Sequence, residues 1–595
     1  MKENDRNKKY LSETICCEKD LSPHNIIQIH SGVGSGKNEF INNVAKGKFF
    51  SGQKSKRPRI LLITTRKAKV NETLNKENTP FKEKSHDWIF VPENSDCFDE
   101  IARWRAIEYN LVCTYAFIEA YLKNRYDPQN PWTHFWNLFD CIVVDEVHGI
   151  LMDASYQSAP FHVARLITYA TQVIEQPKMQ HKYVNPRCKH IITMTGTPVN
   201  IPNWSVMENA HTIDRFKECV NVMPKNVHFI HKKTAIEQIN QQLHNGEKIV
   251  YFCNHTITDP ISTFDIEPEL TPHVAVSFSD KNRRRELEKT NESLYQNMMR
   301  TELNISNKEM LPQDVSFFCS TSRNCEGINI KNTDILHLYV ESHNETLVKQ
   351  MSGRIRYGVE NLYIIVDEKS YSYEDYDISN EINSALVQPH KENPNGFINQ
   401  FLKIKCEEFQ IEGLYGQALN ASRTLHDDEC QPIRRYVEYI EKNHPEIQYD
   451  YFTNLFRYNP LRVQSIRYQL EQDEFFEEAL QKQGGCEMLV QQWFPNAIIH
   501  PYEKIEWQGE ALIKQYMEKQ TVNNGYLEKS EINELTQQLN IIYQKETGEK
   551  SLTLGRLLSR LGNYELKQRS HEKSNPFYNH FRIVEKSKTE EKIAG

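Results

Sequence analysis

The stretch IIQIHSGVGSGKNEFINNVAKG, residues 26–47, joins an apolar run, a glycine-rich turn and a helix-like segment. The run IIQIH is typical of a strand in a parallel sheet that helices cover on both faces. Gly34 and Gly36 allow backbone N–H groups to turn toward phosphate oxygens, and Lys37 is placed to reach the β- and γ-phosphates. Strand, turn, lysine and helix in this order predict an α/β domain that binds a nucleotide.

Two positions of this loop depart from the strict GxxxxGK pattern. Ser31 stands at its first glycine, and Asn38 stands where a hydroxyl residue normally follows the lysine. An asparagine carbonyl oxygen is an acceptable ligand for Mg²⁺, but on a longer arm. Asn38 would bind the metal directly, act through water, or hold the loop without metal. Taken alone, the loop is also compatible with a glycine-rich turn that carries a surface lysine.

Length and composition set the broad class. A chain of 595 residues predicts three or four domains, and 38% hydrophobic with 26% charged residues is an ordinary soluble balance. The net charge of −8 means that contact with a polyanion must come from local basic patches. Thirteen cysteines without a CxxC pair, no secretory signal and no apolar run of about twenty residues predict a cytoplasmic protein without a membrane span.

Apolar runs recur through two thirds of the chain. The runs 60–64, 141–145 and 191–195 alternate with helix-like segments, which predicts a doubly wound α/β domain. A second α/β domain is predicted from a second series of runs, at 226–230, 248–252, 273–278, 315–319, 335–340 and 362–367. The expected boundaries are a flexible arm over 1–21, α/β domains over 22–215 and 216–384, a helical accessory region over 385–505 and a C-terminal domain over 506–595.

An acidic pair ends one of these runs. In CIVVDEVHG, Asp145 and Glu146 follow an apolar strand, at the end where parallel sheets place their ligands. Asp145 suits Mg²⁺ held largely through water, and Glu146 suits a base that orients the attacking water. The alternative is a strand that merely ends in acidic loop residues. In TMTGTPV, Thr195 and Thr197 are candidates to relay the state of the γ-phosphate to a neighbouring domain.

The second α/β domain carries a paired-arginine turn. Gln350, Gly353, Arg354 and Arg356 form a QxxGRxR pattern just before a predicted strand. An arginine inserted across a cleft stabilises the negative charge that phosphoryl transfer spreads over equatorial oxygens. The alternative is a solvated basic turn.

The strings GSGKN, LLITTR, VVDEVH, TGTP, EGINI and QMSGRIR occur in this order over about 22–370. Together they resemble motifs I, Ia, II, III, V and VI of superfamily 2 helicases of the DExH type. The string QMSGRIR and the long gap after motif I are loosely similar to the herpesvirus-type origin-binding helicases and their relatives in phages and mobile elements. The resemblance implies two tandem RecA-like parallel-sheet domains with ATP and Mg²⁺ between them and single-stranded nucleic acid across both.

The resemblance also implies roles for individual residues. The catalytic set is Lys37, Asp145, Glu146, His148, Gln350, Arg354 and Arg356. The nucleotide-binding set is Gly32, Gly34, Ser35, Gly36, Lys37, Asn38 and Gly327, with Asn38 and Asp145 at the metal. The positions that match family contacts to the phosphodiester backbone are Thr64, Thr65, Arg66 and Thr114, while Asn329 with Gly327 faces both nucleotide and strand.

The C-terminal domain reads as three short helices followed by two strands round a basic turn. This order describes a winged helix and is similar to the C-terminal module of phage and plasmid primase–helicases. Arg556 and Arg560 on the third helix would enter a groove, and Lys567 and Arg569 on the wing would touch phosphate. The alternative is a helical protein-interaction domain with a solvated basic hairpin. Aromatic residues of the accessory region, such as Tyr449, are expected in a core rather than stacked on bases.

The whole pattern predicts an ATP hydrolase that acts as a helicase or translocase on nucleic acid. DNA, single-stranded or forked, is favoured, with replication of a phage or mobile element as the setting and replication proteins as further partners. Asn38 keeps a second hypothesis open, a nucleotide-gated nucleic-acid clamp or recruitment factor with weak or no hydrolysis, including a role in anti-phage defence. The choice between DNA and RNA, the polarity of translocation and the oligomeric state are left open.

Overall fold

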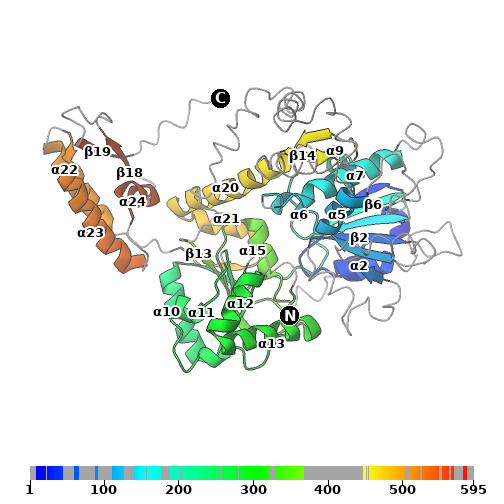
Figure 1. Cartoon of the computed structure of the whole chain (residues 1–595), viewed down its shortest axis with the longest axis horizontal. Coiled ribbons are helices and arrows are strands. Elements are labelled where there is room, and N and C mark those ends of the chain that lie inside the picture. The colour runs from blue at the N-terminus through cyan, green and yellow to red at the C-terminus, as the bar shows by residue number, and fades with distance from the viewer. Residues whose placement is uncertain are drawn as a thin grey trace, which may run out of the picture. The chain divides into compact units, whose positions relative to one another are not determined.

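A computed structural model describes most of the chain at the level of single residues (Figure 1). The described residues are 9–21, 23–44, 59–65, 88–90, 110–125, 136, 139–155, 157–175, 188–201, 204–254, 256–278, 280–321, 328–367, 447–450, 452, 455–502, 508–522, 525–547, 552–561, 564–568 and 580–585. They divide into two compact units, one of residues up to 229 with 239–501, the other of 230–238 with the residues from 502 onward.

The first α/β domain is built on a seven-stranded sheet in the order β3-β4-β2-β5-β6-β1-β7, with every neighbouring pair parallel. The strands are β1 (Ile26–His30), β2 (Ile60–Thr64), β3 (Trp88–Phe90), β4 (Asn110–Thr114), β5 (Cys141–Asp145), β6 (His190–Thr195) and β7 (His211–Asp214). The sequence pattern located β1, β2, β5 and β6 but not the other three. One of those, β7, is mostly exposed at the sheet edge and carries polar residues, so it lacks the apolar signal.

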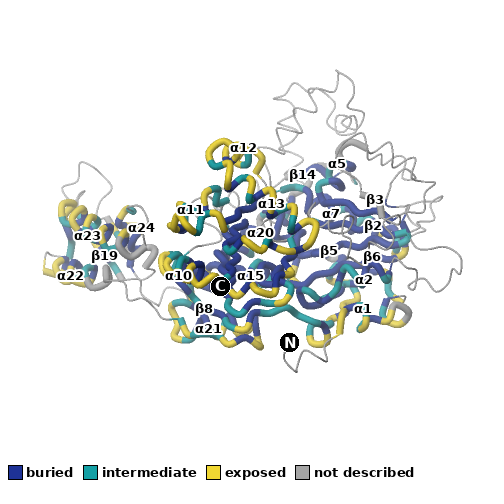
Figure 2. Tube along the Cα trace, turned by 90° about the horizontal axis from the view of Figure 1, so that it is seen from below, coloured by how far each residue is buried: buried dark blue, intermediate teal, exposed yellow. Residues whose placement is uncertain are grey.

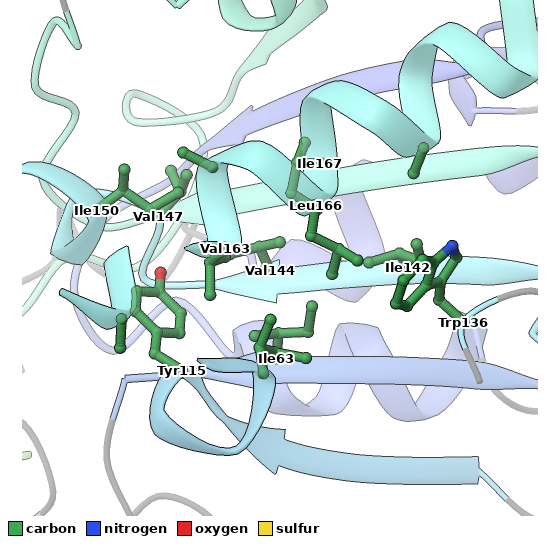
Figure 3. Close-up of a cluster of buried hydrophobic side chains, with 14 of the residues drawn as sticks. Ile63, Tyr115, Trp136, Ile142, Val144, Val147, Ile150, Val163, Leu166 and Ile167 are labelled. Carbon is green, nitrogen blue, oxygen red and sulfur yellow. The ribbon is translucent and has the colours of Figure 1, made fainter. Parts of the chain in front are cut away.

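Both faces of this sheet are buried because successive side chains of a strand point to opposite sides. In β5, Ile142 and Val144 join one core cluster, while Cys141 and Val143 join another. The first cluster is covered by α5 (Tyr115–Arg125), α6 (Gly149–Met152) and α7 (Ala159–Glu175), whose side chains meet the strands in Figure 3. The second is covered by α2 (Lys37–Asn43), and Figure 2 shows the strands between as a buried layer.

The second α/β domain repeats this topology. Its sheet has the order β10-β11-β9-β12-β13-β8-β16. The strands are β8 (Asn226–Ile230), β9 (Lys248–Cys253), β10 (Val274–Ser277), β11 (Phe317–Thr321), β12 (Ile335–Val340), β13 (Asn361–Ile365) and β16 (Ile498–Ile499). Numbered along the chain from one to seven, both sheets read 3-4-2-5-6-1-7. The predicted fold class, two tandem parallel-sheet α/β domains of RecA-like type, is confirmed.

The helices of the second domain are α10 (Lys232–His244), α11 (Pro260–Thr263), α12 (Lys281–Thr290), α13 (Glu292–Lys308) and α15 (Glu345–Ser352). Polar side chains cap the starts of the last three. The side chains of Asp280, Asn291 and Asn344 accept hydrogen bonds from backbone N–H groups in the first turns of α12, α13 and α15. These contacts satisfy donors that have no partner within the helix.

The sequence pattern predicted a helical accessory region, but the described part of this region also contains strands. Its described part contains a hairpin of β14 (Ile447–Asp450) and β15 (Leu455–Tyr458), helices α20 (Pro460–Gln481) and α21 (Gly485–Trp493), and β16, which supplies the seventh strand of the second sheet. The expectation that Tyr449 is a core residue is confirmed, since its side chain is buried in the first domain's cluster.

Helix α20 lies against both α/β domains. Near its start, Arg462 donates to the Ser155 carbonyl at 2.5 Å. In its middle, Gln469 donates to the Met152 carbonyl at 3.5 Å, and the hydroxyl of the neighbouring Tyr468 lies 3.1 Å from Thr346 Oγ1 in the second domain. One turn before its end, the Phe476 ring stacks on that of His343 at 4.1 Å, and it also lies 6.3 Å from the Phe229 ring.

The predicted flexible arm is wrong for residues 9–21. Helix α1 (Leu11–Thr14) and the π-helix Cys17–Leu21 pack onto the first domain, with Leu11 and Leu21 fully buried in its second cluster. A parallel bridge joins Lys9 to Cys219. Three apolar side chains, those of Leu11, Ile15 and Leu21, were enough to anchor a segment that is otherwise polar.

The C-terminal unit has the predicted order of elements. Helices α22 (Gln508–Val522), α23 (Lys529–Thr547) and α24 (Leu554–Leu561) are followed by the antiparallel pair β18 (Tyr564–Gln568) and β19 (His580–Glu585). The short strand β17 (Leu527–Glu528) adds a third strand beside β19. The first two helices are longer than expected, and leucines of α23 and α24 form the core. No described helix is both long and apolar enough to cross a membrane.

Replacing Leu11 with alanine tests the role of the N-terminal segment. Because Leu11 is fully buried, Leu11→Ala should lower the free energy of unfolding by about 2–5 kcal/mol. Leu303→Ala, at a side chain that is 62% exposed, is the matched control and should change it by less than about 0.5 kcal/mol. Urea unfolding followed by circular dichroism measures both, and equal effects would show that residues 9–21 do not hold the first domain together.

A candidate nucleotide site between the two sheets

The phosphate loop, residues 31–38, leaves the end of β1 in the conformation that its glycines were predicted to allow. Gly34 and Gly36 have φ values of 81° and 85°, which side chains with a Cβ rarely adopt. The hydroxyls of Ser31 and Ser35 lie 2.8 Å apart, so the serine at the first glycine position closes the loop through its side chain. The Leu11 N–H donates to the Ser35 carbonyl at 2.8 Å and holds the loop from outside.

Lys37 is not a surface lysine. Only 8% of its side chain is exposed, and its Nζ lies 3.4 Å from Glu146 Oε1. Gly196 leaves room for it, because a Cβ built there would lie 3.1 Å from that Nζ. Glu146 has a φ of 54°, a costly backbone conformation that aims its carboxylate back toward the lysine. The phosphate loop, the acidic pair and the glycine of TMTGTPV thus meet at one ammonium group.

Asp145 lies at the end of β5 with no exposed surface, and its Oδ1 accepts the Glu146 N–H at 3.1 Å. Asn38 is half-buried in the first turn of α2. A buried carboxylate at the carboxyl edge of a parallel sheet and a half-buried asparagine amide in the adjoining helix turn are oxygen donors of the type that fits a hard cation such as Mg²⁺.

Two motifs of the first domain connect through a histidine. The His148 Nδ1 lies 3.4 Å from Glu146 Oε2 and 2.9 Å from Thr195 Oγ1. The Thr197 N–H donates to the same Thr195 hydroxyl at 3.0 Å. His148 is therefore in contact with both the acidic pair and the threonine turn.

The second domain joins this network directly. Gln350 Nε2 donates to Thr197 Oγ1 at 3.0 Å, and Arg354 Nη2 donates to Gln350 Oε1 at 2.9 Å. Arg354 is buried, with 3% of its surface exposed. Polar contacts therefore run without a break from Lys37 in the first domain to Arg354 in the second.

Arg356 faces the phosphate loop. Its Nη2 donates to the Asn329 side-chain carbonyl, and its Nη1 would lie 3.7 Å from a Cβ built at Gly34. Asn329 is itself held by Glu309, a buried carboxylate that accepts the Asn329 Nδ2–H at 3.0 Å and pairs with Lys331 at 2.5 Å. The predicted arginine turn is therefore neither solvated surface nor remote from the loop.

Three contacts at this site were not expected. Val33 packs on Gly353 so closely that a Cβ built there would lie 1.9 Å from Val33 Cγ1. Asn221 Oδ1 accepts the Val33 N–H at 3.1 Å, and Glu309 supports Asn329. The side chains that meet are 20 to 320 residues apart in the sequence, and no local pattern marks Asn221 or Glu309.

The remaining predicted residues lie where parallel strands end, or outside the described residues. Thr64 and Thr114 end the neighbouring strands β2 and β4, and the Thr114 hydroxyl accepts the Phe117 N–H at 3.2 Å at the start of α5. Thr65 follows β2 and packs closely on Gly149, since a Cβ built at Gly149 would lie 2.4 Å from Thr65 Cγ2. The predicted contacts that lie outside the described residues are Arg66, Gly327 and Arg569.

Two of the predicted basic residues of the C-terminal unit are on its surface. Arg556 on α24 and Lys567 on β18 are exposed, while Leu557 and Leu558 of the same helix are buried. Arg560 lies one turn after Arg556 on α24. On this helix the exposed Arg556 therefore contrasts with the buried leucines that follow it.

Burial shifts the pKa of several groups in the first domain. His30, at the end of β1, has a pKa lowered mainly by burial, against the smaller opposing attraction of Asp214. Burial also raises the pKa of the Cys188 thiol to about 12 and that of Cys113 further. These thiols therefore stay protonated at neutral pH, and a protonated thiol is a poor nucleophile.

No protein-family model matches the chain, and no curated protein matches its sequence. Solved structures do match in part. Mss116p bound to ssRNA and AMP-PNP has 13% identity and a TM-score of 0.39, over 74% of this chain and 91% of that one. The helicase MrfA bound to DNA has 12% identity and a TM-score of 0.40, over 77% and 61%. The Mycobacterium smegmatis helicase Lhr bound to ssDNA and AMP-PNP has 12% identity and a TM-score of 0.37, over 88% and 69%. Likenesses of this size do not assign a function to the chain.

A methyl group at Gly353 should disrupt the site. Because it would collide with Val33, Gly353→Ala is expected to displace the arginines and lower nucleotide turnover about 100-fold. Val33→Gly in the same chain removes the colliding atoms and should restore most of that loss. Steady-state phosphate release measures both, with Gly555→Ala, where a Cβ meets no atom within 4 Å, as control. Turnover that is unchanged in Gly353→Ala would contradict the close packing.

Proposed function

We propose that this chain is an ATP hydrolase that drives movement on nucleic acid, a helicase or translocase of the superfamily 2 type. The observation that carries the proposal is the unbroken chain of polar contacts from Lys37 through Glu146 to Gln350 and Arg354, which joins the phosphate loop of one domain to the arginine turn of the other. Phosphoryl transfer requires a cation at the phosphates, a group that orients water and an arginine that stabilises charge. This one series of contacts includes all three groups: Lys37, Glu146 and Arg354.

Lys37 and Glu146 each change their partner when nucleotide binds. A triphosphate in the loop offers Lys37 phosphate oxygens in place of the carboxylate. Glu146 is then released to accept a hydrogen bond from the attacking water and to orient it toward the γ-phosphate. His148, which contacts Glu146 Oε2 and Thr195, holds the carboxylate while it changes partner.

The arginines act from the opposite domain. Arg354 is oriented by Gln350, which is in turn fixed by Thr197, so its guanidinium is positioned before nucleotide arrives. Arg356 lies beside Gly34 at the mouth of the loop. Preorganised cations of this kind stabilise charge that develops on the transferred phosphoryl group. Product release removes that charge and weakens the hold of one domain on the other.

Asp145 and Asn38 are the residues proposed to hold Mg²⁺, with Asp145 acting largely through water. Such an ion, when bound, would supply positive charge that offsets the charge of the phosphates. Asp145 keeps one oxygen occupied by the Glu146 N–H, which fixes the rotation of its carboxylate.

Nucleic acid is proposed to cross the ends of β2 and β4, where Thr64, Thr65 and Thr114 stand, and to be bound also by the C-terminal unit. Exposed Arg556 and Lys567 supply the basic contacts there, in an element order like that of a winged helix. DNA is favoured on this ground, with a DExH-type replication enzyme of a phage or mobile element as the narrower proposal and replication proteins as partners.

The second candidate is a nucleotide-gated clamp with weak or no hydrolysis. Asn38 favours it, because an asparagine on a longer arm replaces the usual hydroxyl ligand in the first turn of α2. In this case closure of the two domains on nucleotide holds nucleic acid without turnover.

Glu146→Gln separates the two candidates. The amide cannot accept the proton of the attacking water, so nucleic-acid-stimulated phosphate release should fall about 100-fold or more, while nucleotide binding is retained. Glu288→Gln, at an exposed side chain on α12, is the control and should have no effect. Release is measured at saturating ATP and Mg²⁺ with single-stranded, duplex and forked DNA and RNA, at a stated salt concentration. Equal rates for wild type and Glu146→Gln would leave only the clamp.

Asn38→Thr tests whether the side chain at position 38 contacts Mg²⁺. A threonine hydroxyl is the usual ligand at this position, so the variant should reach half-maximal activity at a lower Mg²⁺ concentration than wild type, by about tenfold. Mg²⁺ titration of phosphate release measures the midpoint. Identical midpoints would mean that Asn38 holds the loop but does not contact the metal.

A further inference from the structure

The connector, residues 219–226, joins the two α/β domains and contacts the proposed nucleotide-binding segments of both. It runs from the bridge at Cys219, after β7, to the first residue of β8. Its first half lies against the phosphate loop, and its second half lies against the arginine turn, residues 353–360. This one short segment therefore contacts both of the segments that the proposed reaction must bring together.

At the phosphate loop, the connector holds both backbone groups of Val33. The Val33 N–H donates to Asn221 Oδ1 at 3.1 Å, and the Val33 carbonyl accepts the Val222 N–H at 3.0 Å. This is the pairing that a neighbouring strand would give, except that a side-chain amide replaces one backbone carbonyl. The loop tip is thereby fixed by a segment outside its own domain core.

Close packing accompanies these hydrogen bonds. A Cβ built at Gly32 would lie 2.6 Å from Asn221 Cβ, and one built at Gly34 would lie 2.8 Å from Val222 Cγ2. Contacts below 3 Å require one of the two groups to move. The loop glycines are thus needed for the connector as well as for phosphate.

At the arginine turn, the same segment makes backbone contacts. The Lys225 N–H donates to the Val359 carbonyl at 3.1 Å, and the Asn226 N–H donates to the Glu360 carbonyl at 2.9 Å. The Met223 carbonyl would lie 3.0 Å from a Cβ built at Gly358. These partners follow Arg356 by two to four residues in the chain.

We propose that Asn221 is a positioning residue that couples the phosphate loop to the arginine turn through the connector. The inference rests on the proposed function and deepens it. A shift of Val33 when phosphate enters the loop changes the position of Asn221 and Val222, and the backbone pairing at Lys225 and Asn226 passes this displacement to the turn. Asn221 itself touches neither water nor the γ-phosphate in this account.

The test compares Asn221→Ala with Asn240→Ala. Both remove an asparagine side chain that bonds to a backbone group, but Asn240 donates to the Phe264 carbonyl away from the site. Hydrogen–deuterium exchange of residues 32–38 and 353–360 is measured on the full chain with and without AMP-PNP and Mg²⁺. Melting temperatures of both variants show whether a loss reflects folding.

In wild type and Asn240→Ala, nucleotide should slow exchange in both segments. In Asn221→Ala, the loop should still be protected, but protection of the arginine turn and the stimulation of phosphate release by nucleic acid should each fall about fivefold or more. Asn221→Asp keeps the acceptor for the Val33 N–H and should retain protection of the turn.

The outcomes separate the two proposals. If wild type shows no protection of the loop by AMP-PNP, the proposed nucleotide function fails. If wild type is protected in both segments and Asn221→Ala behaves as Asn240→Ala does, the nucleotide function stands and the role of Asn221 is overturned. Loss of turn protection in Asn221→Asp equal to that in Asn221→Ala would exclude the hydrogen bond to Val33 as its cause.

Discussion

The buried ion pair between Lys37 and Glu146 is the contact on which the site depends. An ammonium and a carboxylate with about a tenth of their side chains exposed are stable only when each has a partner. The pair therefore constrains both segments that carry it, the helix that begins at Lys37 and the strand end that places Glu146 at a positive φ. It also explains Gly196, since any side chain there would crowd the ammonium group. An anionic ligand that binds Lys37 therefore has to take the place of the Glu146 carboxylate, which carries charge of the same sign.

Strands were predictable where about four apolar residues in a row are buried on both faces. The run 141–145, four apolar residues followed by Asp145, is such a case, and it matches β5 residue for residue. Strands that lie at an edge, such as β7, or that are two residues long, such as β16, carry no such signal because most of their side chains face solvent. The N-terminal segment was misjudged because its apolar residues are isolated among polar ones, although Leu11 is fully buried.

The site was predictable to the extent that its chemistry is local in sequence. Lysine after a glycine turn and paired carboxylates after a strand are short patterns with a physical reason. The contacts of Asn221 with Val33 and of Glu309 with Asn329 join positions that only the folded chain brings together. Topology adds a further case. Glu341 follows β12 just as the acidic pair follows β5 in the first sheet, yet it accepts hydrogen bonds from Tyr251 and from the Asn254 N–H. The same sheet position is structural in one domain and proposed to be catalytic in the other.

Helix α20 has consequences for how the two α/β domains can separate. One end is attached to the first domain by hydrogen bonds to the carbonyls of Met152 and Ser155 and by Leu461, which is buried in that domain's first core cluster. The other end is attached to the second domain by ring stacking of Phe476 with His343. Both ends therefore bury apolar side chains, and pulling the two domains apart would expose one set of them to water, which is unfavourable. The helix thus acts as a tie that restricts the two sheets to relative shifts that leave both of its ends covered.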